Sequence, residues 1–183
     1  MELNILDWFQ TLHTPILDKI MTSITKLGDA GIFWIVLTLL FLIIPKMRKT
    51  GIIMAAALIM DLLICNVAVK NLAARTRPYE VNTSVQLLVA KLHDYSFPSG
   101  HTAASFASVT ALYLAGERKL WKPALVLACL IAVSRLYLYV HYPTDVLGGM
   151  VFGILAGFAG YWIVKLLEAK LSGRKNAGNQ IRG

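Results

Sequence analysis

The chain has 183 residues, of which 57% are hydrophobic and 15% are charged, and its mean hydropathy is +0.62. Soluble domains carry about a quarter charged residues, so this composition excludes an ordinary soluble domain and indicates an integral membrane protein. The formal net charge of +8 comes largely from loops and the C-terminal tail, where it reports orientation in the membrane, and it requires no nucleic-acid partner.

Residues 1–27 form the first predicted element, an amphipathic segment. The apolar residues Leu17, Ile20 and Ile24 recur with a helical period, and charged residues stand between them. Thr14 followed by Pro15 is typical of a helix N-cap and of the first helical position. We expect a helix that lies in the membrane interface and is preceded by a shorter one. A sixth, imperfect membrane span is the alternative for this segment.

Four later segments approach the roughly 20 apolar residues that a membrane-spanning helix needs. They are residues 28–45, 52–69, 123–140 and 146–164. A fifth segment, 102–115, is shorter and rich in alanine and serine, so it must lie against other helices rather than lipid. The predicted fold is an all-α polytopic membrane helix bundle of five to six helices. Its membrane-embedded domain covers residues 28–168, and residues 169–183 are expected to form a flexible basic tail.

Basic residues mark one side of this bundle. With five spans, the loops after the first and third spans share a side with the C-terminal tail. Together these three regions hold 11 of the 18 Lys and Arg residues. Cytoplasmic loops carry such an excess, so we expect a multi-pass protein of the cell membrane with a cytoplasmic C-terminus.

Polar residues that are costly to bury gather on the opposite, extracytoplasmic side. They come from three separate stretches of the chain, residues 70–77, 99–101 and 134–145. Each of these residues alone has an ordinary explanation as an interfacial anchor or a helix cap. Arg135, however, lies about one turn inside its apolar segment, and charges placed there usually face a polar cavity and mark function. Their convergence therefore favours a functional site.

The cations of this group predict a site for an anion. Lys70, Arg77 and Arg135 supply positive charge, and guanidinium groups suit phosphate through their planar fork of donors. The helix that begins at Ser99 and Gly100 adds a hydroxyl and free backbone N–H groups, which form a natural cradle for phosphate. No His and Cys cluster has metal-ligand spacing, and carboxylates are too few for a two-metal phosphatase. We expect no metal and no cofactor.

Two histidines supply a mechanism for this anion site. Asp145 lies four residues after His141 and is expected to accept a hydrogen bond from one ring nitrogen, which leaves the other free to attack phosphorus. His101 remains to protonate the leaving oxygen. Asp145 also begins a stripe of small residues that continues at Gly149, Gly153 and Gly157. Such stripes pack closely on neighbouring helices, so we expect Asp145 to face the bundle interior.

Three stretches of sequence, "KNLAARTRP" (70–78), "PSGH" (98–101) and "SRLYLYVHYPTD" (134–145), carry a family resemblance. They resemble the three signature blocks of the type 2 phosphatidic acid phosphatase superfamily in order, in spacing and in every defining residue, over residues 66–149. The resemblance implies a nucleophile, His141, that is supported by Asp145, with His101 as the acid and no metal. It implies phosphate binding by Lys70, Arg77, Ser99, Gly100 and Arg135.

The expected partners are the bilayer and a lipid phosphate. Small bacterial members of the superfamily that the chain resembles include undecaprenyl-diphosphate phosphatases and phosphatidylglycerophosphate phosphatases. We expect hydrolysis of undecaprenyl diphosphate through a phosphohistidine, with phosphatidylglycerophosphate and phosphatidic acid as runners-up. A second phosphate would gain from the extra cations Arg75 and Lys91, and the alternative is that either one simply faces water.

A lipid-binding or transport protein that kept the anion site without turnover is the alternative from another class. The intact set of His101, His141 and Asp145 argues against it, and a phosphate-release assay separates the two.

Overall fold

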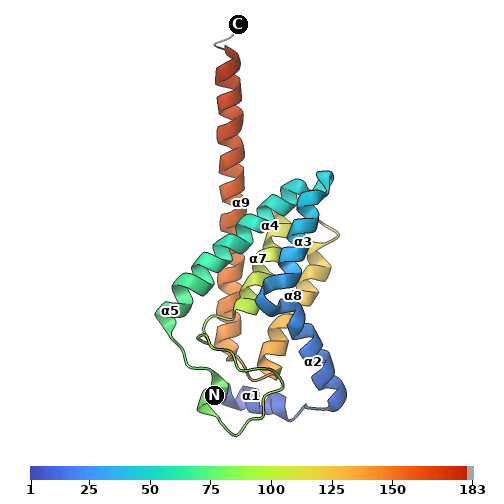
Figure 1. The fold of residues 1–183 in the computed structure, drawn as a ribbon, viewed down its shortest axis with the longest axis vertical. Coiled ribbons are helices and arrows are strands. Elements are labelled where there is room, and N and C mark those ends of the chain that lie inside the picture. Colours follow the sequence, from blue (N-terminus) through green and yellow to red (C-terminus); the bar gives the residue numbers. More distant parts are fainter. Residues whose placement is uncertain (181–183) are drawn as a thin grey trace.

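The computed structural model describes residues 1–180, with side chains as far as residue 173. In that part of the chain every regular element is helical (Figure 1), which confirms the predicted all-α membrane helix bundle. The elements are α1 (Glu2–Gln10), α2 (Pro15–Gly28), η1 (Asp29–Gly31), α3 (Ile32–Ile43), η2 (Pro45–Met47), α4 (Arg48–Asp61), the π-helix η3 (Leu62–Val69), α5 (Lys70–Ala73), α6 (Pro78–Val81), α7 (Gly100–Leu114), α8 (Trp121–Tyr137) and α9 (Pro143–Gln180).

Helix α7 forms the centre of the bundle. Helices α4, α8 and α9 all pack against it, and every residue from Thr102 to Leu112 is buried. Because most of its side chains are small, the neighbouring helices approach it closely. The structure confirms that this short segment lies against protein rather than lipid.

Helix α9 crosses α7 through the predicted stripe of small residues. A Cβ atom added at Gly149 would lie 2.6 Å from the carbonyl oxygen of Ser99, and one at Gly153 would overlap the backbone of Ala103. Larger side chains do not fit at these positions. The close approach also joins the two helix starts, because the Ser99 N–H donates to the carbonyl oxygen of Asp145 at 3.0 Å.

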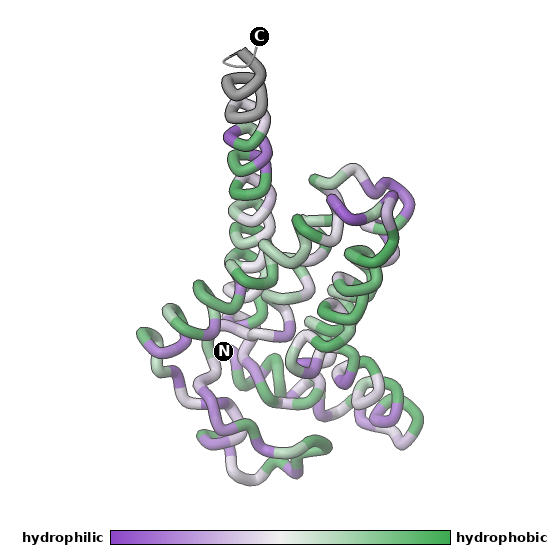
Figure 2. Tube along the Cα trace, turned by 45° about the horizontal axis from the view of Figure 1, so that its top comes forward, coloured by the Kyte–Doolittle hydropathy of each residue, from purple (hydrophilic) through white to green (hydrophobic). Residues whose placement is uncertain are grey.

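The outer surface of the bundle is strongly apolar. Large hydrophobic side chains stand exposed along α3, and Figure 2 shows this helix in hydrophobic colours. By length and composition, three helical stretches could cross a membrane: Pro15–Ile43, Pro45–Val81 and Pro143–Gly173. Helices α7 and α8 are shorter, with 15 and 17 residues. An apolar surface of this extent is stable in lipid and marks a membrane protein.

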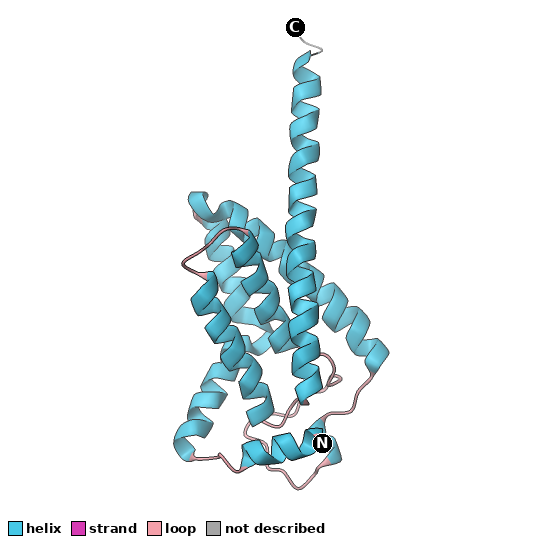
Figure 3. Cartoon of the chain, turned by 180° about the vertical axis from the view of Figure 1, so that it is seen from behind, coloured by secondary structure: helices cyan, strands magenta, loops and turns pink. Residues whose placement is uncertain are grey.

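The two N-terminal helices lie at the end of the bundle opposite the C-terminus (Figures 1 and 3). As predicted, Thr14 caps α2 by accepting from the Leu17 N–H at 3.2 Å, and Pro15 takes the first helical position. Helix α2 meets α3 at a kink, where Ala30 and Gly31 adopt φ of +48° and +67°. This left-handed turn brings residue 29 beside the start of α7.

Helix α9 continues to Gln180, past the boundary predicted at residue 168. The described part of the predicted flexible tail is thus helical. Residues 166–171 favour helix, and no proline follows them to end it. Residues 181–183 lie outside the described part of the chain. The division into three segments stays a prediction.

Candidate active site

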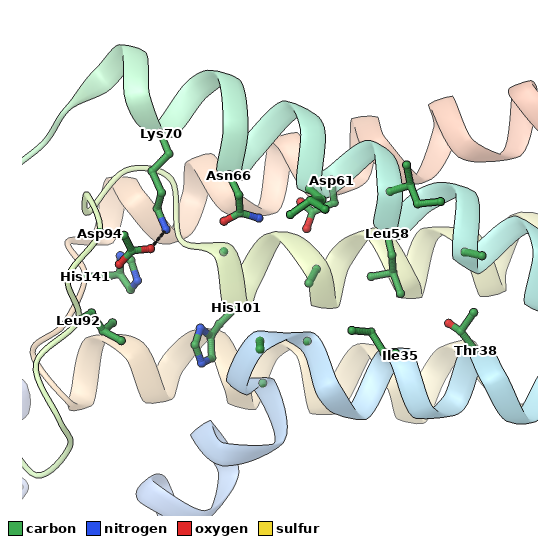
Figure 4. Close-up of a pocket in the computed structure, with 18 of the residues that line it drawn as sticks. Ile35, Thr38, Leu58, Asp61, Asn66, Lys70, Leu92, Asp94, His101 and His141 are labelled. Carbon is green, nitrogen blue, oxygen red and sulfur yellow. Dashed lines mark hydrogen bonds and ion pairs between the residues drawn. The ribbon is translucent and has the colours of Figure 1, made fainter.

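The eight site residues predicted from the sequence gather at the end of the bundle where α7 and α9 begin. Five of them line one cavity of about 640 Å³: Lys70, Arg77, Gly100, His101 and His141. Figure 4 shows the side chains of Lys70, His101 and His141 directed into this cavity from three different parts of the chain. The other three, Ser99, Arg135 and Asp145, are buried.

A carboxylate that the sequence did not predict joins two of the cations. One oxygen of Asp94 pairs with Lys70 Nζ, and the other lies 2.5 Å from Arg77 Nη2. Burial by itself would raise the pKa of Asp94, but Lys70 and Arg77 outweigh it and lower the pKa to about 2. The two cations that were predicted to bind phosphate thus hold an anionic group of the protein itself.

Arg77 connects this carboxylate to the nucleophile candidate. Its Nε donates to the backbone carbonyl of Asp94 at 2.8 Å, and its Nη1 donates to the carbonyl oxygen of Val140 at 2.8 Å. Nη1 also lies 3.4 Å from Nε2 of His141. With 2% of its surface exposed, Arg77 fixes the loop before α7 against the turn before α9.

The contacts of His141 define which ring nitrogen is free. A guanidinium only donates hydrogen bonds, so the Nε2 that faces Arg77 must present its lone pair, and the proton resides on Nδ1. Nδ1 lies 3.5 Å from Asp145 Oδ2, an ion-pair distance without a hydrogen bond. Burial of the ring, reinforced by Arg135 and Arg77, lowers the pKa of His141 to about 3, although Asp145 acts in the opposite direction. The neutral ring therefore turns a lone pair toward the anion site.

Several donors other than His141 hold Asp145 in place. It accepts hydrogen bonds from the Ser96 hydroxyl at 2.5 Å and from the Tyr142 backbone N–H at 2.9 Å. Arg75 Nη1 pairs with its second oxygen at 2.6 Å. These contacts fix a fully buried carboxylate behind His141.

The expected role of Arg75 as a cation for a second phosphate is wrong. Its guanidinium pairs with Asp145 and with Glu2 at 2.6 Å each, and it lies over the ring of Tyr142. Because Ala74 adopts a left-handed conformation with φ of +43°, the chain turns after α5, and Arg75 stabilises the turn before α9 instead of lining the cavity.

His101 has a carboxylate partner that was also missed. Its Nε2 lies 2.9 Å from Oδ1 of Asp29, in the kink between α2 and α3. In the same kink, a Cβ atom at the neighbouring Gly28 would come within 2.7 Å of the ring. The ring is therefore held between the kink and α7.

The remaining predicted residues occupy buried positions near the helix start. Arg135 donates to the hydroxyl of Thr25 through Nη1, whereas its buried Nε has no partner. The Ser99 hydroxyl accepts from Thr102 at 3.0 Å and does not cap α7. Gly100 packs closely on Asn66, because a Cβ atom there would lie 3.0 Å from Oδ1 of that residue, and Gly100 lines the cavity.

Faint signals for the missed carboxylates are present in the sequence. Asp94 lies five residues before Ser99, in a loop that has predicted site residues, Arg77 and Ser99, at its two ends. Asp29 interrupts an apolar run between two glycines, Gly28 and Gly31, where a chain bend is expected. Neither position carries a charge pattern that identifies its partner.

Comparisons with known proteins identify the family of this chain. The sequence profile of the PAP2 superfamily matches residues 50–168. The chain belongs to the PAP2 superfamily. In the described part of the chain, no three His, Cys, Asp or Glu side chains gather as a metal site would require.

Two named relatives of this PAP2 protein are undecaprenyl-diphosphatases. The undecaprenyl-diphosphatase of Sulfolobus acidocaldarius is 32% identical over 142 residues, which cover 78% of this chain and 68% of that protein. The undecaprenyl-diphosphatase BcrC of Bacillus subtilis is 33% identical over 160 residues, which cover 85% and 79%. The protein is accordingly a membrane lipid phosphatase, a hydrolase that acts on phosphate esters.

Two solved structures share the fold. The crystal structure of Aquifex aeolicus LpxE superposes with a TM-score of 0.75 at 28% identity, covering 87% of this chain and 93% of that one. A PAP2-type phosphatidylglycerolphosphate phosphatase of Bacillus subtilis gives a TM-score of 0.69 at 30% identity, covering 91% and 84%.

Proposed function

We propose that this PAP2 phosphatase hydrolyses undecaprenyl diphosphate to the monophosphate on the extracytoplasmic side of the cell membrane. His141 is the nucleophile, Asp145 supports it, and His101 is the general acid. The phosphoryl group is bound by Lys70, Arg77, Ser99, Gly100 and Arg135, without a metal or cofactor.

The proposed reaction proceeds in two displacements. Nε2 of His141 attacks the terminal phosphorus, the bond from phosphorus to the bridging oxygen breaks, and His101 gives its proton to that oxygen. A water molecule then attacks the phosphohistidine while His101 takes one of its protons. The P–N bond breaks, and inorganic phosphate leaves. Once the phosphoryl group has displaced Asp94 from Lys70 and Arg77, the cations and the helix N–H groups stabilise the negative charge that develops in the transition state.

The proposal of a long-chain lipid substrate rests on a single cavity that is charged at one end and mainly apolar at the other. Its charged end holds Lys70, His101 and His141, and Figure 4 shows its other end extending between α3 and α4. The apolar end is lined by Ile35, Leu39, Leu42, Leu58, Ile59 and Leu62. A phosphate carried on a flexible apolar chain matches both ends at once.

Arg75 pairs with Glu2 and Asp145, so it does not support a second phosphate in the substrate. The choice of a diphosphate therefore rests on the relatives named as undecaprenyl-diphosphatases. The likeness to a phosphatidylglycerolphosphate phosphatase keeps phosphatidylglycerophosphate, and with it phosphatidic acid, as the second candidate.

The positions of the basic turns support the proposed extracytoplasmic placement. Lys49 at the start of α4 pairs with Glu168 of α9 at 2.8 Å, and Thr50 donates to Glu117 in the turn after α7. These three regions therefore lie at one end of the bundle, and the starts of α7 and α9 lie toward the other (Figure 1). The excess of Lys and Arg at the first end favours its exposure to the cytoplasm.

Cysteine labelling in intact cells tests this sidedness. In a chain whose two native cysteines are replaced, Lys91→Cys should react with an impermeant maleimide and Lys119→Cys should not. The reverse pattern would put the chemistry in the cytoplasm.

Phosphate release by the purified enzyme in mixed micelles tests the substrate. Undecaprenyl diphosphate should give the highest kcat/KM of the three lipids. A preference of about tenfold for either glycerolipid, roughly 1.4 kcal/mol in transition-state binding, would overturn this choice. Release from none of them would support a binding or transport protein instead.

A further inference from the structure

The N-terminal segment contacts the catalytic end of the bundle at separate points. Thr25 accepts a hydrogen bond from Arg135, Glu2 pairs with Arg75, and Asp29 lies 2.9 Å from His101. The superfamily profile begins only at residue 50, so these contacts come from a part of the chain that the profile does not cover.

The contact from Asp29 is the one that reaches a proposed catalytic group. A carboxylate accepts hydrogen bonds, so the Nε2 that faces Oδ1 of Asp29 carries a proton. Nδ1 is then the nitrogen that can exchange a proton with substrate. Only 15% of the His101 side chain is exposed, and Gly28 packs against the ring, so the ring has little freedom to turn.

The surroundings of His101 mean that it needs a nearby carboxylate, Asp29, to act as a general acid. A histidine must be an imidazolium to donate a proton, and burial of the ring together with the cations Arg135 and Lys70 lowers the pKa of His101. Asp29 is the carboxylate in contact with the ring, and its charge favours the imidazolium.

We propose that Asp29 is a positioning residue for the general acid His101, an inference that rests on the proposed function. Asp29 holds the proton on Nε2 throughout the cycle. The Nδ1 proton passes to the leaving oxygen as the P–O bond breaks, and it is restored from water when the phosphohistidine is hydrolysed. The kink at η1 thus belongs to the catalytic apparatus, because it carries the carboxylate to α7.

Leaving-group dependence distinguishes this role from a purely structural one. Phenyl phosphate needs a proton on its leaving oxygen, whereas dinitrophenyl phosphate does not. The rate of the phosphorylation step is measured by rapid quench, as the initial burst of phenol or dinitrophenol. In Asp29→Asn this rate should fall by about 100-fold for phenyl phosphate, a typical contribution of a general acid, and by less than threefold for dinitrophenyl phosphate. Asp29→Glu should recover most of the lost rate.

Two further variants complete the test. Asp18→Asn removes another carboxylate of the N-terminal segment, one that accepts from the Tyr137 hydroxyl, and should change neither rate more than threefold. In a His101→Ala background, Asp29→Asn should have no further effect on dinitrophenyl phosphate.

Equal losses on both esters in Asp29→Asn, or a further loss in the His101→Ala background, would overturn the proposal. An unchanged burst on phenyl phosphate would overturn it as well, with the proposed function intact. A wild-type enzyme that forms no phosphoenzyme with either ester would instead contradict the proposed function.

Discussion

Replacing Asp94 by asparagine should make the enzyme bind oxyanions more tightly. The two oxygens of Asp94 pair with Lys70 and Arg77, and these are the cations that we propose for the phosphoryl group. An incoming phosphate or vanadate must therefore displace the carboxylate before it can bind there. Asparagine keeps the size of the side chain and removes its charge, so the competition weakens.

The magnitude follows from the exposure of the carboxylate. The Asp94 side chain is 52% exposed, so solvent screens each pair, and a pair of this kind contributes about 0.2–1 kcal/mol. The two pairs together amount to roughly 1 kcal/mol, which corresponds to about a fivefold change in an inhibition constant.

The effect should not depend on pH in the working range. The pKa of Asp94 falls from its ordinary value of 3.8 to about 2, so folding depresses it. The stabilisation from the two pairs is complete above the unfolded pKa and is lost as the pH falls through about 2. From about pH 5 upward the carboxylate stays ionised, and the gain in Asp94→Asn should be constant.

Inhibition by vanadate and by inorganic phosphate measures this effect. Asp94→Asn should lower both inhibition constants about fivefold, and the control Glu80→Gln, which alters a carboxylate that accepts the Arg77 backbone N–H, should leave them within twofold. A higher inhibition constant in Asp94→Asn would refute the reasoning, because it would mean that Asp94 holds the two cations in place for phosphate.

Other predictions concern the histidines, the metal and the packing. His141→Ala and His101→Ala should each reduce lipid turnover by orders of magnitude at unchanged Tm, whereas wild-type turnover in His141→Ala would remove the proposed nucleophile. Saturating EDTA should change the rate by less than twofold, and an absolute requirement for added magnesium would exclude the proposed chemistry. Gly153→Leu should lower the stability by about 1–3 kcal/mol or more in a thermal or denaturant melt, because it meets the backbone of Ala103, whereas Gly173→Leu meets nothing within 4 Å and should leave the melt unchanged.

Much of the fold was predictable because its causes are local in the sequence. The small residues of α7 imply close helix packing, and the structure buries that helix. The spacing of Gly149 and Gly153 places both on one helical face, which meets α7 as expected. The cap at Thr14 depends on two adjacent residues and formed as predicted.

The missed contacts depend on how distant segments meet. Asp29 and His101 are 72 residues apart, and their contact needs the left-handed turn between α2 and α3. Asp94 reaches Arg77 only because its loop folds back across the cavity. Arg75 and Arg77 look equivalent in the sequence, and only the path of the chain after Ala74 turns one toward Asp145 and the other toward His141.

The covalent intermediate on His141 is the central claim, and trapping it is the most direct test. The enzyme is mixed with lipid diphosphate labelled in its terminal phosphate, quenched in alkali within milliseconds, digested and mapped. Label stable to alkali and labile to acid should appear on the peptide that contains His141, and should be absent from His141→Ala. Label on another residue, or turnover without any phosphoenzyme at a time resolution faster than kcat, would contradict the account.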